Sequence, residues 1–280
     1  MMTPIERAAQ AIDATSSGLI VATGAGMGVD SGLPDFRGTE GFWRAYPPIK
    51  KRKIRFEEMA NPAWFDREPE FAWGFYGHRL NLYRNTQPHL GFDLIHSWAD
   101  KFVSGVFVFT SNVDGQFQKA GFSEDKIHEC HGSIHHLQCT QPCCDQIWSA
   151  KGFEIEVNEE TLTATTPLPK CPYCGSLARP NILLFGDMRW VSGRAAVQHD
   201  EQEDWVAELT DSPVIIECGA GTHVPSVRYF SQQMVRRTRA TLIRINPREA
   251  EVPPNHVSIA LPALEAIEQI NETRSRAGAS

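Results

Sequence analysis

The stretch that decides the fold runs Gly18-Leu19-Ile20-Val21-Ala22-Thr23-Gly24-Ala25-Gly26-Met27-Gly28. It opens with a short apolar run, and such a run that ends in turn residues is typical of a buried strand. Glycines after the strand would let the backbone approach a phosphate closely, and the N–H groups of a following helix could hold that anion. A single glycine-rich turn is a weak sign of a nucleotide site, because many such turns are only tight turns.

Three more apolar runs resemble the first, over residues 106–110, 214–218 and 242–246. Helical patterns lie between them, for example over 91–101 and 224–238. Buried strands that alternate with helices predict an α/β fold, with a Rossmann-like parallel sheet and helices on both faces. A sheet of this kind binds ligands at the carboxyl ends of its strands.

Two segments interrupt the alternation of strands and helices. Residues 44–88 are rich in aromatic side chains and contain a strong helical pattern over 68–84, and residues 137–180 contain two close groups of cysteines. We expect both to be insertions that form a smaller zinc-ribbon and helical domain. The predicted boundaries are 1–43, 89–136 and 181–280 for the Rossmann-like domain, 44–88 for the helical insertion and 137–180 for the zinc-binding module.

Composition limits the class of protein. The chain has 280 residues, a net charge of −7, and hydrophobic and charged fractions of 41% and 22%, which are ordinary values for a globular protein. The negative charge argues against non-specific binding to nucleic acid or anionic membranes, and the basic segment 49–55 is interpreted as a solvated loop or helix start. No apolar run approaches the ~20 residues that span a bilayer, and residues 5–15 predict an amphipathic helix instead of a signal peptide. We therefore expect a cytoplasmic protein with neither nucleic acid nor membrane as a partner.

The cysteines indicate a metal site. The chain has seven of them, an odd number, and Cys171-Pro172-Tyr173-Cys174 is a C-x₂-C knuckle. Its partner group is Cys139 with either Cys143 or Cys144, and we choose Cys143 because its spacing from Cys139 is nearer to the commonest knuckle. Tetrahedral zinc takes four thiolates from two such turns, so the sequence predicts one structural zinc. The alternative is four free thiols in a small core.

The residues after the glycine turn are more specific than the turn itself. They read Val29-Asp30-Ser31-Gly32-Leu33-Pro34-Asp35-Phe36-Arg37-Gly38, and a generic dinucleotide fold has no need of them. In these residues the chain resembles the sirtuin family, whose pattern runs from Gly-Ala-Gly to Ser-Gly-Ile-Pro-Asp-Phe-Arg. Further matches follow in the family's order: Thr110-Ser111-Asn112-Val113-Asp114, His131-Gly132, the two cysteine pairs, Phe185-Gly186-Asp187, Gly219-Ala220-Gly221-Thr222 and Ile245-Asn246. An ordered set of motifs over nearly the whole chain is far more specific than any one of them.

The resemblance implies an NAD-dependent protein-lysine deacylase, which transfers the acyl group to ADP-ribose and releases nicotinamide. It implies that His131 is the general base and that Asn112 lies near the ribose and the acyl group. His128, His135 and His136 compete for the role of base on composition alone, but only His131 is followed by the matching glycine. The residues implied to bind the cofactor are Gly24, Ala25, Gly26, Asp35, Phe36, Arg37, Ser111, Asn112, Asp114, Gly219, Gly221, Thr222 and Asn246.

The chain departs from the family at several cofactor positions. Gly28 stands where serine is usual, Ser111 where glutamine is usual, and Ala220-Gly221 where Thr-Ser is usual. Each lost side-chain hydrogen bond would weaken cofactor binding by roughly 0.5–1.5 kcal/mol. These departures leave two other functions open: an ADP-ribosyltransferase or NAD hydrolase on the same scaffold, and a non-catalytic NAD sensor.

The helical insertion offers a candidate acyl pocket. Tyr76 and Arg79 are three residues apart, so they share a helix face. This Tyr-x-x-Arg resembles the signature of the sirtuin subgroup that removes succinyl or malonyl groups, in which an arginine would pair with the free carboxylate. The alternative is that Tyr76 packs among Phe71, Trp73 and Phe75 while Arg79 pairs with a carboxylate such as Glu70. The implied partner is an acylated protein or peptide, and the sequence specifies neither that partner nor the oligomeric state.

Overall fold

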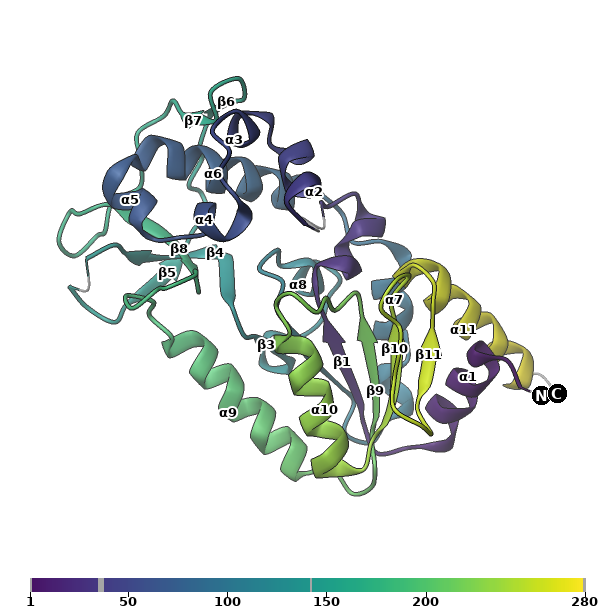
Figure 1. Cartoon of the computed structure of the whole chain (residues 1–280). Coiled ribbons are helices and arrows are strands. Elements are labelled where there is room, and N and C mark those ends of the chain that lie inside the picture. The colour runs from purple at the N-terminus through teal and green to yellow at the C-terminus, as the bar shows by residue number, and fades with distance from the viewer. Residues whose placement is uncertain (1, 35–37, 142, 279–280) are drawn as a thin grey trace.

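The largest sheet has six parallel strands in the order β11-β10-β9-β1-β2-β3 (Figure 1). The computed structural model describes residues 2–34, 38–141 and 143–278. The strands are β1 (Leu19–Thr23), β2 (Val106–Thr110), β3 (Ile127–Glu129), β9 (Val214–Cys218), β10 (Thr241–Ile245) and β11 (Val257–Ile259). The strand order reverses between β1 and β9, which is where sheets of this type bind dinucleotides. The predicted parallel α/β fold is confirmed.

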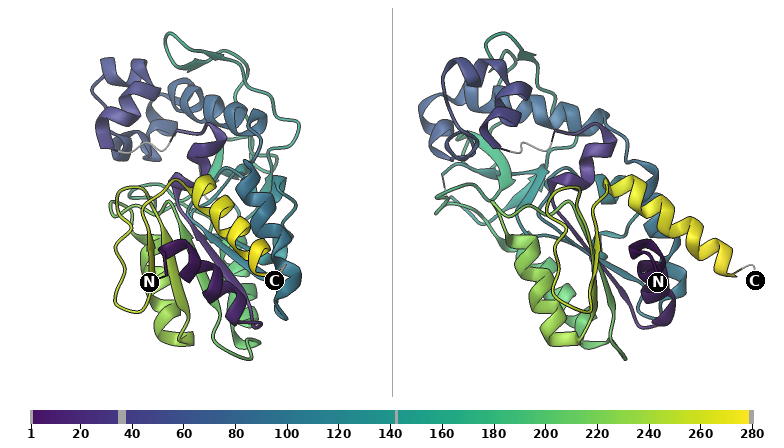
Figure 2. Two further views of the ribbon diagram at one scale, coloured as in Figure 1. Left: turned by 90° about the vertical axis from the view of Figure 1, so that its right-hand side faces the viewer. Right: turned by 45° about the vertical axis from the view of Figure 1, so that its right-hand side comes forward.

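Helices cover both faces of this sheet, because successive side chains of a strand point to opposite faces. Leu19 and Val21 pack in a core with α1 (Pro4–Ala14), α7 (Leu90–Ser97) and α11 (Ala263–Gly278). Ile20 and Ala22 pack in the core on the other face with α9 (Gly193–Ala207) and α10 (Ser226–Thr238). The right-hand view of Figure 2 shows these two layers of helices on either side of the sheet.

The two predicted insertions share one hydrophobic core. The first lies in a run of helices made of α2 (Gly38–Ala45), which begins before the predicted bound at residue 44, α3 (Pro47–Lys51), α4 (Phe56–Met59), α5 (Ala63–Arg67) and α6 (Pro69–Asn85). The second contributes β5 (Ile147–Ser149), β6 (Val157–Asn158), β7 (Thr163–Ala164) and most of an antiparallel sheet β5-β4-β8, with β4 (Gly132–Cys139) and β8 (Ala178–Ile182). Trp73 and Phe75 of α6 pack in the same core as Ile134 and Leu137 of β4, and the Trp73 indole N–H donates to the Ala178 carbonyl at 2.9 Å. The two insertions are therefore one small domain beside the Rossmann-like sheet, as expected.

Short elements complete the chain: α8 (Gln116–Lys119) and the 3₁₀ helices η1 (Ala25–Ser31), η2 (Ala99–Lys101) and η3 (Glu124–Lys126). The helix expected after the glycine turn is thus a single 3₁₀ segment. The three glycines at 24, 26 and 28 lower helix propensity over this stretch, which favours the shorter element.

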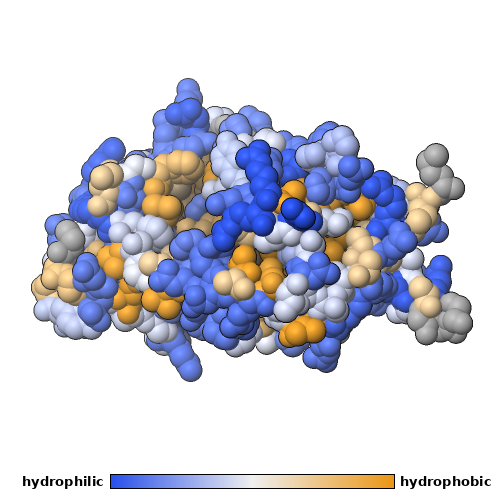
Figure 3. Space-filling model, turned by 90° about the horizontal axis from the view of Figure 1, so that it is seen from below, coloured by the Kyte–Doolittle hydropathy of each residue, from blue (hydrophilic) through white to orange (hydrophobic). Residues whose placement is uncertain are grey.

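The surface carries few large apolar areas on the face at the amino ends of the strands. Figure 3 shows this face as mostly hydrophilic, with small and separate hydrophobic patches.

In the basic segment 49–55, Arg52 is ion-paired with Glu68 at 2.7 Å and lies 4.2 Å from the centre of the Phe71 ring. Among the described residues, no helix combines the length and the apolar character needed to cross a bilayer.

Candidate active site

Two glycine turns form the floor of the site at the carboxyl ends of β1 and β9. The Gly24 N–H donates to the Cys218 carbonyl at 3.0 Å, and the Gly26 N–H donates to the Gly219 carbonyl at 3.1 Å. Gly219 has a φ of +63°, and a Cβ atom there would lie 2.4 Å from the Gly26 backbone. Only glycine fits this position, so the sequence of the second turn is constrained by its contact with the first.

A cavity of about 150 Å³ opens beside these turns, at the switch point between β1 and β9. Its lining includes Gly26, Asp30, Gly219, Ile245, Pro247 and Arg248. The backbone around it comes from the ends of three adjacent strands, as in other sheets that hold a dinucleotide at this edge. The residues present therefore fit part of an extended dinucleotide such as NAD.

Asn112 and Asp114 follow β2 and face the first glycine turn. The Asn112 side-chain N–H donates to the Gly24 carbonyl at 3.0 Å, which ties the end of β2 to the turn. Asp114 is buried and accepts the Gln116 N–H at 3.0 Å. The predicted loop residues Asp35, Phe36 and Arg37 lie outside the described residues.

Burial raises the pKa of Asp114 to about 6. The Glu129 carboxylate also raises this pKa, whereas the hydrogen bond from the Gln116 N–H and the Arg79 charge lower it. The departure at Gly28 is part of this environment. A Cβ atom at Gly28 would lie 3.7 Å from the Asp114 carboxylate, so the serine that the family usually has would place a hydroxyl beside it. The glycine leaves this buried carboxylate with fewer neighbouring donors.

His131 is half-buried between β3 and β4, where the Rossmann-like sheet passes into the small domain. Its ring Nε2 lies 3.2 Å from the Ser226 hydroxyl of α10. Burial lowers the pKa of His131, with the Ser111 carbonyl acting in the opposite direction, so the neutral form needed for a base is favoured. Gly132 beside it has a φ of +76°, and a Cβ atom there would lie 2.1 Å from the Asn181 carbonyl oxygen.

Two of the neighbouring histidines, His128 and His135, have structural contacts. The His128 ring bonds the Gln202 side chain at 2.9 Å, and the His135 ring bonds the Asp114 carbonyl at 2.9 Å. His136 is half-buried, and desolvation lowers its pKa to about 4. The rings of His128 and His135 are thus held by other hydrogen bonds, and the role of His131 as the base stays a prediction.

The turn after β9 is held by side chains from two other elements. The Ala220 carbonyl accepts Nε and Nη2 of Arg228 at 3.1 and 3.0 Å and Nδ2 of Asn246 at 3.0 Å. The Asn246 side chain is buried and also accepts the backbone N–H groups of Arg248 and Glu249. The Thr222 hydroxyl donates to the Glu249 carboxylate at 2.7 Å. Asn246 and Thr222, which the sequence assigns to cofactor binding, thus organise the loop in this structure, and direct contact with a cofactor stays a prediction.

Tyr76 and Arg79 lie in the small domain and are both buried. Arg79 donates from Nε and Nη2 to the Tyr83 hydroxyl at 3.0 and 2.6 Å. Tyr76 stacks on Phe65, and its buried hydroxyl has no hydrogen-bond partner within the described part of the chain. The Tyr76 ring therefore packs among aromatic side chains, as the alternative interpretation expected. That packing does not provide a hydrogen-bond partner for the Tyr76 hydroxyl among the described residues.

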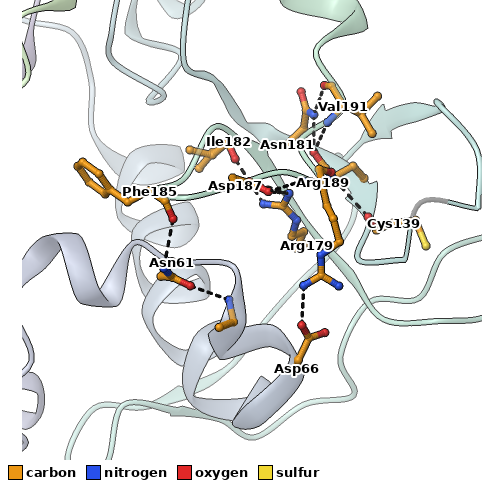
Figure 4. A network of polar contacts seen from close by, with 12 residues as sticks. Asn61, Asp66, Cys139, Arg179, Asn181, Ile182, Phe185, Asp187, Arg189 and Val191 are labelled. Atoms are coloured by element: carbon orange, nitrogen blue, oxygen red, sulfur yellow. Dashed lines mark hydrogen bonds and ion pairs between the residues drawn. The ribbon is translucent and has the colours of Figure 1, made fainter.

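The predicted Phe185-Gly186-Asp187 segment follows β8. The Asp187 side chain is buried and forms an ion pair with Arg179 at 2.7 Å. Figure 4 shows this pair at the centre of a polar network. In this network Arg189 forms an ion pair with Asp66, and the Asn61 side chain donates to the Phe185 carbonyl. The network fixes the segment 185–189 against the helical insertion.

Four cysteine sulfur atoms come together at the far end of the small domain. Cys139, Cys143, Cys171 and Cys174 have their Sγ atoms within 4.8 Å of one another. The Cys139–Cys174 and Cys143–Cys171 distances are 3.6 and 3.7 Å, close to the ~3.8 Å that a tetrahedral site with Zn–S bonds of ~2.3 Å requires. The Ser176 hydroxyl and N–H lower the pKa of Cys174 to about 6, which favours a thiolate ligand. The arrangement fits a zinc ion and leaves no open coordination position.

Ser226, Arg228 and Tyr83 were not predicted from the sequence. Arg228 offered one signal, because it is a charged residue at a position of the 224–238 helical pattern that packs inward. Tyr83 is four residues after Arg79 on the same helix, a spacing that predicts contact. Ser226 carried no signal, since only the tertiary fold brings it to His131.

Known proteins share this fold and these motifs. The Sir2 family profile matches residues 24–219. An NAD-dependent protein deacylase from Archaeoglobus fulgidus is 33% identical over 243 residues, 86% of each chain, and one from Pyrococcus furiosus is 35% identical over 243 residues, also 86% of each. A Sir2 homologue solved in complex with NAD has a TM-score of 0.71 at 27% identity, covering 97% of this chain and 94% of that one. Since the profile match spans more than half of the chain and the relatives align over most of their length, the chain belongs to the Sir2 family.

Proposed function

We propose that this chain is an NAD-dependent protein-lysine deacylase that prefers acidic acyl groups such as succinyl and malonyl. Membership of the Sir2 family and the names of the relatives support the deacylase activity. The buried Arg79 beside Tyr76 is the observation that supports the acyl preference. The substrate would be an acylated protein or peptide.

Each site residue has a task in this reaction. NAD, when bound, supplies the ribose that accepts the acyl group and the nicotinamide that leaves. Ionised Asp114 accepts the N–H donors of a carboxamide, and Asn112 fixes the end of β2 against the Gly24 turn. Neutral His131 takes a proton from a hydroxyl at Nε2, the nitrogen that faces the Ser226 hydroxyl.

Burial and charge support the proposed acyl pocket. Arg79 lies among the aromatic rings of Phe75 and Tyr83, and Tyr46, Tyr76 and Tyr83 are the phenols nearest to its charge. Burial raises the pKa of all three phenols, so they are neutral and can donate to a carboxylate. A carboxylate bound here would gain a charge-assisted hydrogen bond in a desolvated site, where such bonds are strongest. An acetyl group would use neither the charge nor the phenols.

The test compares succinyl-, malonyl- and acetyl-lysine forms of one peptide, with products identified by mass. The wild type should show the higher kcat/KM on the acidic acyls, and Arg79→Met should lower that value about 100-fold while changing deacetylation by only a few-fold. Tyr76→Phe should give a smaller loss with the same selectivity, because it removes one hydroxyl and keeps the ring. Arg67→Met, which removes an exposed cation from the same domain, is the matched control.

Two results would contradict the proposal. Deacetylation that equals or exceeds desuccinylation in the wild type, without a selective effect of Arg79→Met, would reject the acidic preference and leave the deacylase. Free ADP-ribose, or ADP-ribosylated peptide, as the main product would replace the deacylase with an NAD hydrolase or an ADP-ribosyltransferase.

A further inference from the structure

Arg228 is a buried basic residue in the first turn of α10. Its side chain is 11% exposed and points away from solvent towards two loops at the carboxyl edge of the sheet. Burying a guanidinium group is costly unless its donors are satisfied. The contacts that satisfy them indicate what the residue does.

One end of the guanidinium group holds the turn after β9. Nε and Nη2 of Arg228 both donate to the Ala220 carbonyl, at 3.1 and 3.0 Å, and Asn246 Nδ2 adds a third donor at 3.0 Å. The peptide group is planar and trans, so fixing the Ala220 carbonyl also fixes the direction of the Gly221 N–H on its opposite side. Arg228 therefore orients the Gly221 N–H. This donor lies in the turn whose first residue, Gly219, accepts the Gly26 N–H.

The same guanidinium group reaches the loop after β10. Nη2 donates to the Glu249 carbonyl at 2.6 Å and lies 3.6 Å from the Glu249 carboxylate. The carboxylate in turn accepts the Thr222 hydroxyl at 2.7 Å. The two loops, 219–222 and 246–249, are thus joined through one buried cation, and residues of both border the cavity at the switch point.

We propose that Arg228 is a positioning residue for the cofactor, one that replaces side-chain contacts by fixing the backbone. The turn contains Ala220-Gly221, which has no hydroxyl to offer a ribose or phosphate. In this chain the turn binds the dinucleotide through backbone N–H groups, and Arg228 holds those groups in their binding orientation before the ligand arrives. Preorganisation of this kind raises affinity because less conformational freedom is lost on binding. The inference rests on the proposed function, since the ligand is NAD.

The test measures ADP-ribose binding by calorimetry and the separate kinetic constants for NAD and peptide. Arg228→Met keeps the bulk of the stem and removes the donors. It should raise the Kd for ADP-ribose and the KM for NAD about tenfold, with kcat and the KM for peptide within about twofold. Arg228→Lys keeps the charge with a single donor group and should recover part of the affinity. Arg237→Met removes an exposed cation from the same helix, paired with Glu203 at 2.6 Å, and should bind like the wild type.

The outcomes separate this inference from the proposed function. Arg228→Met and Arg228→Lys proteins that bind ADP-ribose as tightly as the wild type would overturn the positioning role alone. A lower kcat together with a higher KM for peptide and a lower thermal stability would also overturn it, because a residue with only a structural role would change all three. Should Arg228→Met fail to fold, the Lys variant decides by the same criteria. A wild-type protein that binds neither ADP-ribose nor NAD would overturn the proposed function, and this inference with it.

Discussion

Asp114 is the residue at which stability and function oppose each other. A carboxylate that is to bind a carboxamide must be ionised, yet this one is buried, and its pKa is raised from 3.8 to about 6. A group whose pKa is raised by folding stabilises the fold below its unfolded pKa and loses that contribution as the pH rises through the folded value. Above pH 6 the ionised Asp114 therefore lowers the free energy of unfolding.

Asp114→Asn should stabilise the protein at neutral pH. At pH 8 the free energy of unfolding should rise by about 1–3 kcal/mol, because the two-unit shift is removed while an amide oxygen can still accept the Gln116 N–H. The gain should shrink as the pH falls from 6 towards 4. Urea unfolding at pH 8 and pH 5 measures it, and a gain that is equal at both pH values would show that the ionised carboxylate is not its source. NAD turnover should be lost in the same variant.

His131→Ala should remove deacylation and leave cofactor binding. Loss of a general base typically lowers the rate 10²–10⁴-fold, and the ADP-ribose Kd should change by only a few-fold. In the wild type, kcat/KM for NAD should fall below about pH 6, since Asp114 becomes protonated in the free enzyme. His199→Ala, at an exposed histidine on α9, serves as the control. Deacylation by the His131 variant within a few-fold of wild type would disprove its role.

At the scale of elements, the four cysteines of the candidate zinc site come from two turns, one at the end of β4 and one before β8. Cys139 ends β4, Cys143 lies in the loop that follows, and Cys171 and Cys174 lie in the turn before β8. β4 and β8 are neighbours in the antiparallel sheet, so an ion between the two turns closes one end of that pair. The other end carries Gly132 and the residues beside His131. Metal therefore acts on the active site only through the stability of this sheet.

Zinc removal should lower the thermal stability of the protein without lowering the kcat of the molecules that remain folded. Metal analysis should find about one zinc per chain, and Cys171→Ser should lose it and unfold at a lower temperature while its folded fraction keeps the wild-type kcat. Cys144→Ser is the matched control: its Sγ lies 3.6 Å from that of Cys143 but outside the group of four. Zinc loss from Cys144→Ser, with zinc retained in Cys143→Ser, would exchange the two assignments.

At the scale of the whole molecule, the site lies between two hydrophobic cores. The Rossmann-like sheet supplies the glycine turns, Asn112 and Asp114, whereas the small domain supplies Tyr76 and Arg79. His131 is at the crossing between them, because β3 belongs to one sheet and β4 to the other. The Arg79 charge lowers the pKa of Asp114, so the candidate acyl pocket and the candidate carboxamide-binding residue Asp114 are electrostatically linked across this boundary.

The sequence by itself determined the features that local patterns encode. Four apolar runs predicted β1, β2, β9 and β10, and the spacing of cysteines selected the four sulfur atoms that the structure brings together. The glycine turn after the first strand was visible in the sequence, whereas the contact that requires glycine at position 219 comes from the distant Gly26 backbone. Strands β3 and β11 have three residues each and are too short to show a periodic pattern, so they were not predicted.

Only the tertiary structure decided the contacts between distant segments and the charge states that depend on burial. The Ser226 hydroxyl reaches a histidine 95 residues away, and Asn246 and Arg228 meet at a carbonyl that precedes both in the chain. The core that the two insertions share also joins residues far apart in the chain, such as Trp73 and Leu137. The pKa of Asp114 likewise follows from the removal of water by residues far along the chain, because desolvation depends on everything packed around a group and not on its sequence neighbours.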